Sequence, residues 1–318
     1  MIIKEIADKS QDKNILQQLL RRPDLIQGTR QKIEEKLKYL NSGIKGENKS
    51  AYQLNFYYRN SEDWIVIHDL RLVFQHQIAQ IDHLLINRFL QVFVCESKSV
   101  SGDIIINEQG EFSYKYATNT KEVASPLRQN QRHMAVLENI FRSGLITLPK
   151  RLGIRLQPSL ESLILVTENT KIVRPQNQVA GIERIIKTDQ VKAKVEEYTQ
   201  KLQWLRLCKK ISSSTLKNIG QQLCDLHRSA PTTDWYEQFG IYPSDEFKAE
   251  AAAGACPAPA STKATAEATL GELSQCAGCG RNLTAAEKQF CDHHPMKFNS
   301  QAYCYPCQRT VAANETSR

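Results

Sequence analysis

The stretch Gln80–Gly102, QIDHLLINRFLQVFVCESKSVSG, predicts two neighbouring apolar strands that nevertheless carry charge. Asp82 opens the first apolar run, and Glu96 and Lys98 close the second. Because side chains alternate between the two faces of a strand, Glu96 and Lys98 share one face. If residues 87–91 connect two antiparallel strands, Asp82 lies opposite Glu96. The sequence alone does not fix this register, and a slip of one residue would separate the two carboxylates.

Two carboxylates this close repel each other, and burial raises the cost of keeping both ionised. A divalent cation removes that cost, because Mg²⁺ (or Mn²⁺) takes oxygen ligands and completes its shell with water and substrate phosphate. Such an ion lowers the pKa of a bound water, and Lys98 could orient that water or stabilise developing negative charge. The pattern therefore indicates a metal site for phosphodiester hydrolysis, with Asp82 and Glu96 as ligands. The alternative is a weak Glu96–Lys98 pair at an exposed strand end, since Glu-x-Lys alone is common.

Four motifs of the chain, GIKGE, QIDHLLI, VFVCESKSVSG and SPLRQNQRH, occur in this order over about residues 43–165. Together they resemble the NERD (nuclease-related) domain. The resemblance implies an α/β fold with a restriction-endonuclease-like PD-(D/E)XK core, in which a mixed sheet is flanked by helices. It also implies DNA as the substrate class, without a particular sequence specificity.

The same resemblance implies roles for five residues. Asp82 matches the motif aspartate, and Glu96 and Lys98 match the acid and the lysine of the E-x-K pair. Gln129 matches the glutamine on the helix after the sheet, which is expected to face the site. Glu47 matches the acidic residue of the family's first helix, which can complete the metal shell.

Other polar residues near these strands have simpler interpretations. Ser97 stands where the family more often has an apolar residue, and its side chain should point to the opposite face without affecting the chemistry. His83 alternates away from the preceding aspartate and is expected to be a packed or hydrogen-bonded imidazole. His68 is expected to be solvated near a strand end. His133 could approach phosphate or lie on a solvated helix face.

Apolar periodicity and composition divide the chain into segments. Helical spacing runs from residue 10 to about 41, with an interruption near Pro23 and Gly28, and a further helix carries Glu47 in its first turn. The segment DWIVIHDLRLVF is expected to form a strand, a turn and the entry to another strand. The expected divisions are an N-terminal helical segment (1–42), the NERD nuclease-like domain (43–165), a helical extension (166–246), a flexible linker (247–272) and a zinc finger (273–310).

Five of the nine cysteines lie close together near the C-terminus. Cys276-x-x-Cys279 and Cys304-x-x-Cys307 each predict a knuckle that presents two thiolates, and two knuckles complete a tetrahedral Zn²⁺ site. Cys291 is the spare, which either packs in the small core or substitutes as a ligand. The module is similar to the C-terminal zinc fingers of some NERD proteins and to the four-cysteine topoisomerase finger. Its Phe298 and Tyr303 could stack on bases, but packing around the zinc is the favoured interpretation.

The formal net charge is +8, which favours polyanions weakly. No apolar run reaches the roughly 18 residues of a membrane helix, and the N-terminus lacks a long apolar region. The protein is therefore expected to be soluble and cytoplasmic, with no membrane partner.

Three functions remain open. They are a Mg²⁺-dependent DNA nuclease whose zinc finger helps to hold DNA, a non-catalytic nucleic-acid-binding protein and a zinc-scaffolded interaction protein. The intact set of Asp82, Glu96 and Lys98 favours the first. Protein partners and cleavage mode are not indicated by the sequence.

Overall fold

A computed structural model describes residues 1–201, 210–241, 275–280, 283, 288, 291–292, 298, 301–304 and 307. The chain divides into two compact units, Met1–Phe247 and Lys248–Arg318. The linker predicted for residues 247–272 lies outside the described residues. None of the described helices is long and apolar enough to cross a membrane.

The first unit is built on a six-stranded mixed sheet with the order β1-β2-β3-β4-β10-β12. Its strands are β1 (Ile2–Lys4), β2 (Trp64–Phe74), β3 (Gln77–Asn87), β4 (Gln91–Lys98), β10 (Ser159–Val166) and β12 (Ile185–Lys187). The hairpins β2–β3 and β3–β4 are antiparallel, whereas β1 pairs with β2, and β10 with β4 and β12, in parallel. The parallel pairing of β4 with β10 requires a crossover, which contains helix α3.

A smaller sheet has the order β11-β5-β6-β7 and extends from the end of β4. Its strands are β5 (Asp103–Ile106), β6 (Phe112–Lys115), β7 (Thr120–Val123) and β11 (Ile172–Val173). The strands β5 and β6 pair antiparallel and form a hairpin. A separate two-stranded ribbon consists of β8 (Lys150–Arg151) and β9 (Ile154–Arg155).

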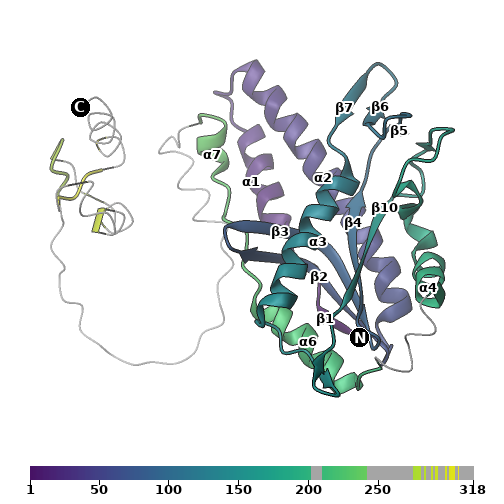
Figure 1. Cartoon of the computed structure of the whole chain (residues 1–318). Helices are drawn as coiled ribbons and strands as arrows, with labels where there is room; N and C mark the ends of the chain where they lie inside the picture. The colour runs from purple at the N-terminus through teal and green to yellow at the C-terminus, as the bar shows by residue number, and fades with distance from the viewer. Residues whose placement is uncertain are drawn as a thin grey trace. The chain divides into compact units, whose positions relative to one another are not determined.

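Helices cover both faces of the main sheet (Figure 1). They are α1 (Ser10–Leu20), α2 (Gln27–Tyr58), α3 (Pro126–Ser143), α4 (Val191–Lys201), α6 (Ser213–Asp225) and α7 (Trp235–Gln238), with short 3₁₀ turns at Ile182–Arg184 and Thr188–Gln190. Residues of α3 and α6 share a core with one face of the sheet, and residues of α2 and α4 share a core with the other. The predicted fold class, a mixed sheet flanked by helices, is confirmed.

Helix α3 follows the sequence signals closely. The Ser125 side chain accepts a hydrogen bond from the backbone N–H of Arg128, Pro126 occupies the first turn, and Gly144 ends the helix with φ 93°. Such a cap satisfies one of the free N–H groups of the first turn. This rigid start fixes the next residues of the helix, which face the sheet.

Two expectations about elements are wrong. A single helix, α2, covers residues that the sequence pattern divided between two helices, so Glu47 lies in its interior and not in a first turn. The expected boundary at residue 42/43 also falls inside this helix. The segment expected to contain a turn is one continuous strand, β2, which is irregular only at Asp69, where φ is 51°.

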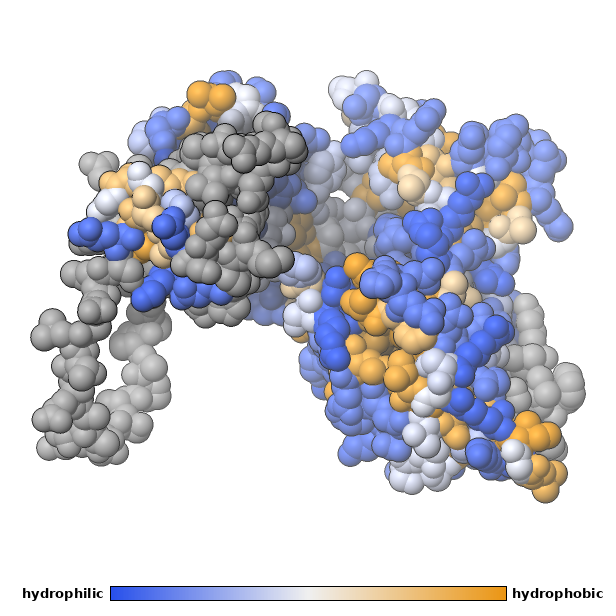
Figure 2. All heavy atoms as spheres, turned by 60° about the vertical axis from the view of Figure 1, so that its left-hand side comes forward, coloured by the Kyte–Doolittle hydropathy of each residue, from blue (hydrophilic) through white to orange (hydrophobic). Residues whose placement is uncertain are grey.

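The described surface is mostly hydrophilic in the view of Figure 2, with apolar patches interrupted by polar residues. The most exposed large apolar or aromatic side chains are those of Ile26, Tyr52, Phe56, Leu152 and Ile154.

Candidate functional site

The antiparallel hairpin β3–β4 brings the two predicted carboxylates together. His83 pairs with Cys95, so Asp82 and Glu96 stand one position further along the same ladder. The backbone N–H of Ser97 donates to Asp82 Oδ2 at 2.8 Å, which holds the aspartate against the end of β4. The register predicted for these strands is therefore confirmed.

Glu96 is the centre of the site and is only 5% exposed. Lys98 Nζ lies 2.7 Å from Glu96 Oε1, and Gln129 Nε2 of α3 donates to the same oxygen at 2.8 Å. Lys98 also donates to Gln129 Oε1 at 3.3 Å, so the three side chains form a closed triangle. The structure therefore brings together the acid, the lysine and the glutamine that the sequence singled out.

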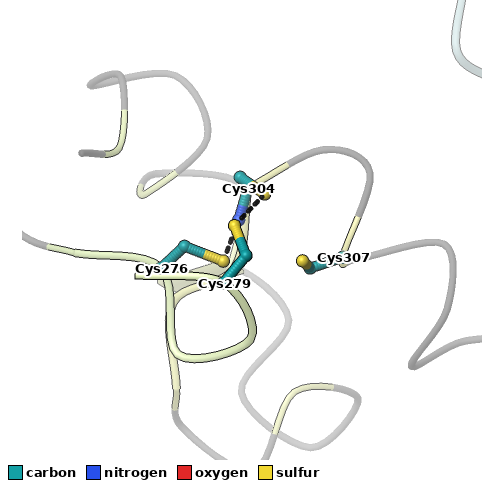
Figure 3. A group of neighbouring side chains, drawn as sticks. All are labelled: Cys276, Cys279, Cys304 and Cys307. Atoms are coloured by element: carbon teal, nitrogen blue, oxygen red, sulfur yellow. Dashed lines mark hydrogen bonds between the residues drawn. The ribbon is translucent and has the colours of Figure 1, made fainter. Parts of the chain in front are cut away.

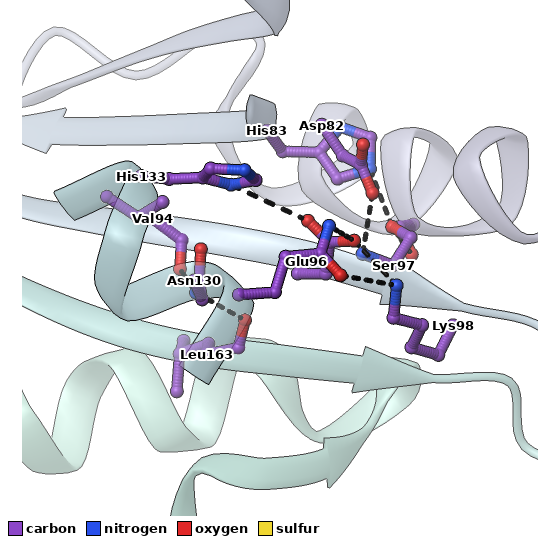
Figure 4. Close-up of polar contacts among 11 residues, drawn as sticks. Asp82, His83, Val94, Glu96, Ser97, Lys98, Asn130, His133 and Leu163 are labelled. Atoms are coloured by element: carbon purple, nitrogen blue, oxygen red, sulfur yellow. Dashed lines mark hydrogen bonds and ion pairs between the residues drawn. The ribbon is translucent and has the colours of Figure 1, made fainter. Parts of the chain in front are cut away.

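His133 approaches the other oxygen of Glu96, one helical turn beyond Gln129. Its Nδ1 lies 4.0 Å from Glu96 Oε2, and this buried nitrogen has no hydrogen-bond partner. Figure 4 shows Glu96 between His133 and Lys98. The residue is only 8% exposed, so the solvated helix face considered for it is excluded. The spacing i, i+4 from Gln129 was the signal that could have placed it at the site.

The two carboxylates of the site differ in how far positive charge compensates them. Burial raises the pKa of Asp82 well above its ordinary value, and the nearby charges of Glu96 and Glu47 raise it further. Burial lowers the pKa of Lys98, but Glu96 outweighs this effect and the net pKa is raised. An ion pair with Lys98 thus compensates Glu96, whereas among the described residues Asp82 has a hydrogen bond from the Ser97 backbone N–H and no ion pair.

Glu47 lies near this group without joining it. Its Oε2 is 2.5 Å from Lys9 Nζ, an ion pair contributed by the loop before α1. Within the described part of the chain, the compact groups of three or more His, Cys, Asp or Glu ligand atoms are limited to the C-terminal cysteines. Glu47, Asp82 and Glu96 therefore do not form a closed three-ligand set in this structure. Lys9 was missed, because no local pattern links it to a helix 38 residues away.

Asp69 is a second residue that the sequence pattern missed. The β2–β3 ladder pairs His68 with His83 and Leu70 with Ile81, so its irregularity falls where Asp69 faces Asp82. Aspartate adopts a positive φ more readily than most residues. Gln80 Nε2 donates to Asp69 Oδ1 at 2.8 Å.

Helix α2 approaches the end of β4 very closely. Ser42 Oγ donates to the carbonyl of Ser99 at 2.9 Å, and a Cβ built on Gly46 would lie 2.6 Å from Ser99 Cβ. Glycine at position 46 permits this approach, which explains one residue of the GIKGE motif. The approach sets the position of Glu47 beside the strand end.

A buried polar network lies on the α2 side of the sheet. His68 Nδ1 contacts His83 Nδ1 at 2.8 Å, and His83 Nε2 contacts Ser97 Oγ at 3.0 Å. Ser97 Oγ continues to Ser50 Oγ at 2.9 Å, and Asn55 Oδ1 contacts His68 Nε2 at 2.9 Å. His83 is hydrogen-bonded as predicted, but His68 is fully buried and not solvated. Burial lowers the pKa of His68 to about 4.

The second unit contains the predicted cysteine cluster (Figure 3). The sulfur atoms of Cys276, Cys279, Cys304 and Cys307 all lie within 4.8 Å of one another. Four thiolates about 2.3 Å from a tetrahedral Zn²⁺ would be separated by roughly 3.8 Å. The four cysteines could therefore hold zinc with little rearrangement.

The pKa values of these thiols also agree with a cation-binding site. Although burial opposes it, backbone N–H groups of Cys304, Gly278 and Cys279 lower the pKa of Cys276 to about 6. A hydrogen bond with Cys304 is the main cause that raises the pKa of Cys307 to about 12. Four crowded thiols therefore cannot all ionise by themselves, and a bound cation would remove this conflict.

Three further described residues of this unit, Cys291, Phe298 and Tyr303, pack against one another. Cys291 is 3% exposed, and its sulfur accepts from the backbone N–H of Tyr303 at 3.3 Å. Phe298 is 1% exposed, with its ring centroid 6.1 Å from that of Tyr303. Packing, the interpretation favoured for Cys291 and the two aromatic residues, agrees with these contacts. Gly280 turns the first knuckle with φ 74°.

The fold and site define an α/β protein that carries a carboxylate–lysine–glutamine group at the end of a mixed sheet. Residues 42–165 match the family model described as the nuclease-related domain, NERD, so the chain contains a NERD domain. No curated protein and no solved structure matches the chain.

Proposed function

We propose that the protein is a Mg²⁺-dependent nuclease that hydrolyses phosphodiester bonds of DNA. The observation that carries the proposal is the pair of carboxylates formed by half-buried Asp82 and buried Glu96, with Lys98 beside Glu96. The nuclease-related domain over residues 42–165 supports nucleic acid as the substrate class.

The donor set suits a hard divalent cation. Asp82 and Glu96 offer carboxylate oxygens, and burial together with the negative charges of Glu96 and Glu47 raises the pKa of Asp82. Asp82 and Glu96 would hold Mg²⁺, or Mn²⁺ in its place, with Glu47 able to contribute once it leaves Lys9. When bound, the ion would supply an activated water and a positive charge next to the phosphate.

The chain's own residues have separate tasks in this mechanism. Gln129 and Lys98 hold Glu96 Oε1, which leaves Oε2 available. Lys98 can donate to a phosphate oxygen as negative charge develops there. His133 Nδ1 lies 4.0 Å from Glu96 Oε2, and a small movement of the carboxylate would let the two atoms form a hydrogen bond that orients Glu96. The zinc module would assist DNA binding. Its four cysteines support a metal site and give no evidence about DNA.

The test is cleavage of single- and double-stranded DNA by the full-length protein with Mg²⁺, Mn²⁺ or EDTA. We expect metal-dependent cleavage that Asp82→Asn abolishes, because an amide is a poor Mg²⁺ ligand. Lys98→Ala should retain metal binding and lose turnover, since its role lies in the transition state. Lys32→Ala, on the exposed surface of α2, is the matched lysine control. DNA binding without cleavage under every condition would favour the non-catalytic alternative.

A further inference from the structure

A cavity of about 360 Å³ opens beside the candidate site. It lies between the segment after β1 and helix α2, and is lined by Ile6, Ala7, Asp8, Lys9, Ser10, Lys13, Asn41, Ile44, Glu47 and Asn48. Its volume is within the roughly 300–1,000 Å³ of typical small-ligand sites. Most of the lining precedes residue 42, outside the part of the chain that matches the nuclease-related domain.

The cavity and the carboxylate group share one residue, Glu47. Glu47 binds Lys9 at the cavity wall, and its charge also raises the pKa of Asp82. Gly46, the neighbour of Glu47, lies against the residue that follows Lys98, because a Cβ built on Gly46 would be 2.6 Å from Ser99 Cβ. The cavity therefore adjoins the carboxylates that would act on a phosphodiester.

The polar groups of the wall can bind a phosphorylated ligand. Lys9 and Lys13 carry positive charge at this wall, and lysine ammonium groups attract phosphate. Asp8 opposes an anion, because hydrogen bonds from the hydroxyl and the N–H of Ser10, at 2.8 Å each, lower its pKa and keep its carboxylate ionised. The attraction for phosphate therefore rests on the two lysines.

Resting on the nuclease function proposed above, we propose that this cavity binds one nucleotide of the substrate strand, next to the phosphodiester that is cleaved. Lys9 and Lys13 contact its phosphate, and Asn41 and Asn48 provide hydrogen-bonding groups for its sugar or base. Without a strand, Glu47 keeps Lys9 in position through their ion pair. The N-terminal segment thus contributes a substrate-binding wall to the nuclease-related domain.

The experiment measures binding of a 5′-phosphorylated, fluorescently labelled tetrathymidylate to the full-length protein in EDTA, by fluorescence polarisation. We expect Lys9→Ala with Lys13→Ala to weaken binding at least about tenfold. Their removal should also reduce the slope of log K against log salt by about 0.7, since the two lysines share one phosphate and each single-strand phosphate contact contributes roughly that amount. Lys32→Ala should bind as the wild type does, and Lys9→Arg should retain most of the affinity.

Because Lys9→Ala breaks the pair with Glu47, thermal melts must accompany each variant. If the variants that contain Lys9→Ala fail to fold, the single variant Lys13→Ala tests the cavity, because the described contacts give Lys13 no ion pair to lose. Equal affinity in the lysine variants and in Lys32→Ala, or no binding by the wild type, would overturn the cavity assignment and leave the nuclease proposal standing. Lysine-dependent binding by a wild-type protein that never cleaves DNA would support the cavity and overturn the nuclease function.

Discussion

At the scale of single residues, the site depends on one carboxylate, Asp82, that has no ion pair within the described part of the chain. Glu96 has Lys98 and Gln129, but Asp82 has the N–H of Ser97 and lies near two other carboxylates. Folding therefore favours the protonated form of Asp82. Removing this charge should therefore stabilise the metal-free protein and weaken its binding of metal.

Asp82→Asn tests this asymmetry. In EDTA near neutral pH we expect the variant to be at least as stable as the wild type, because the ionised carboxylate is the form that folding disfavours. Mg²⁺ at about 100 times its Kd should stabilise the wild type by about 2.7 kcal/mol and leave the variant almost unchanged. Calorimetric melts with and without Mg²⁺ measure both effects. Equal stabilisation of the two proteins would remove Asp82 from the metal site.

His68 gives a prediction for pH. Its pKa is lowered by burial to about 4, from an ordinary value of about 6.5, so the unfolded chain binds this proton first as pH falls. The corresponding stability is present above about pH 6.5 and is lost as pH falls towards 4. Between pH 7 and 5 the loss should be about 2 kcal/mol. Urea unfolding at the two pH values should show a correspondingly smaller pH effect in His68→Gln, and an unchanged pH effect would contradict the assignment.

At the scale of elements, the sequence pattern predicted strand alternation better than helix boundaries. Alternation in β4 placed Glu96 and Lys98 on one face, and two apolar runs with a short connection predicted the hairpin that brings in Asp82. The sequence pattern ended one helix near residue 41 and began another with Glu47 in its first turn, whereas α2 is continuous over Gln27–Tyr58. Lys9 could not be predicted, because its position depends on how a remote segment packs against α2.

Two glycines of α2 form a matched pair for testing this packing. A Cβ at Gly46 would meet Ser99, whereas a Cβ at Gly43 has nothing within 4 Å. Gly43→Ala should stabilise the protein by about 0.5–1 kcal/mol through helix propensity. Gly46→Ala gains the same propensity but overpacks the contact with β4, at a cost of about 1–3 kcal/mol. Chemical denaturation should therefore move the two midpoints in opposite directions, and equal shifts would contradict the close approach of α2.

At the scale of the whole molecule, the two units rely on different sources of stability. The first buries three apolar clusters around its sheets and a fourth between α1, α2 and α7. The described residues of the second include few large buried apolar side chains, with Phe298 the largest. The CxxC spacing predicted its metal group from sequence alone because each knuckle is a local structure. A unit of this kind gains much of its folding free energy from zinc.

This difference leads to a prediction about metal removal. Elemental analysis of the full-length protein should find about one zinc per chain, and Cys276→Ser combined with Cys307→Ser should lose it, because two hydroxyls replace two thiolate ligands. Calorimetry should still show the main transition of the first unit at its original temperature, since its core contains none of these cysteines. Cys224→Ser, a cysteine of the first unit, is the matched control and should retain the zinc. Full zinc content in the double variant would contradict the ligand set, and a large shift of the main transition would show that the two units fold as one.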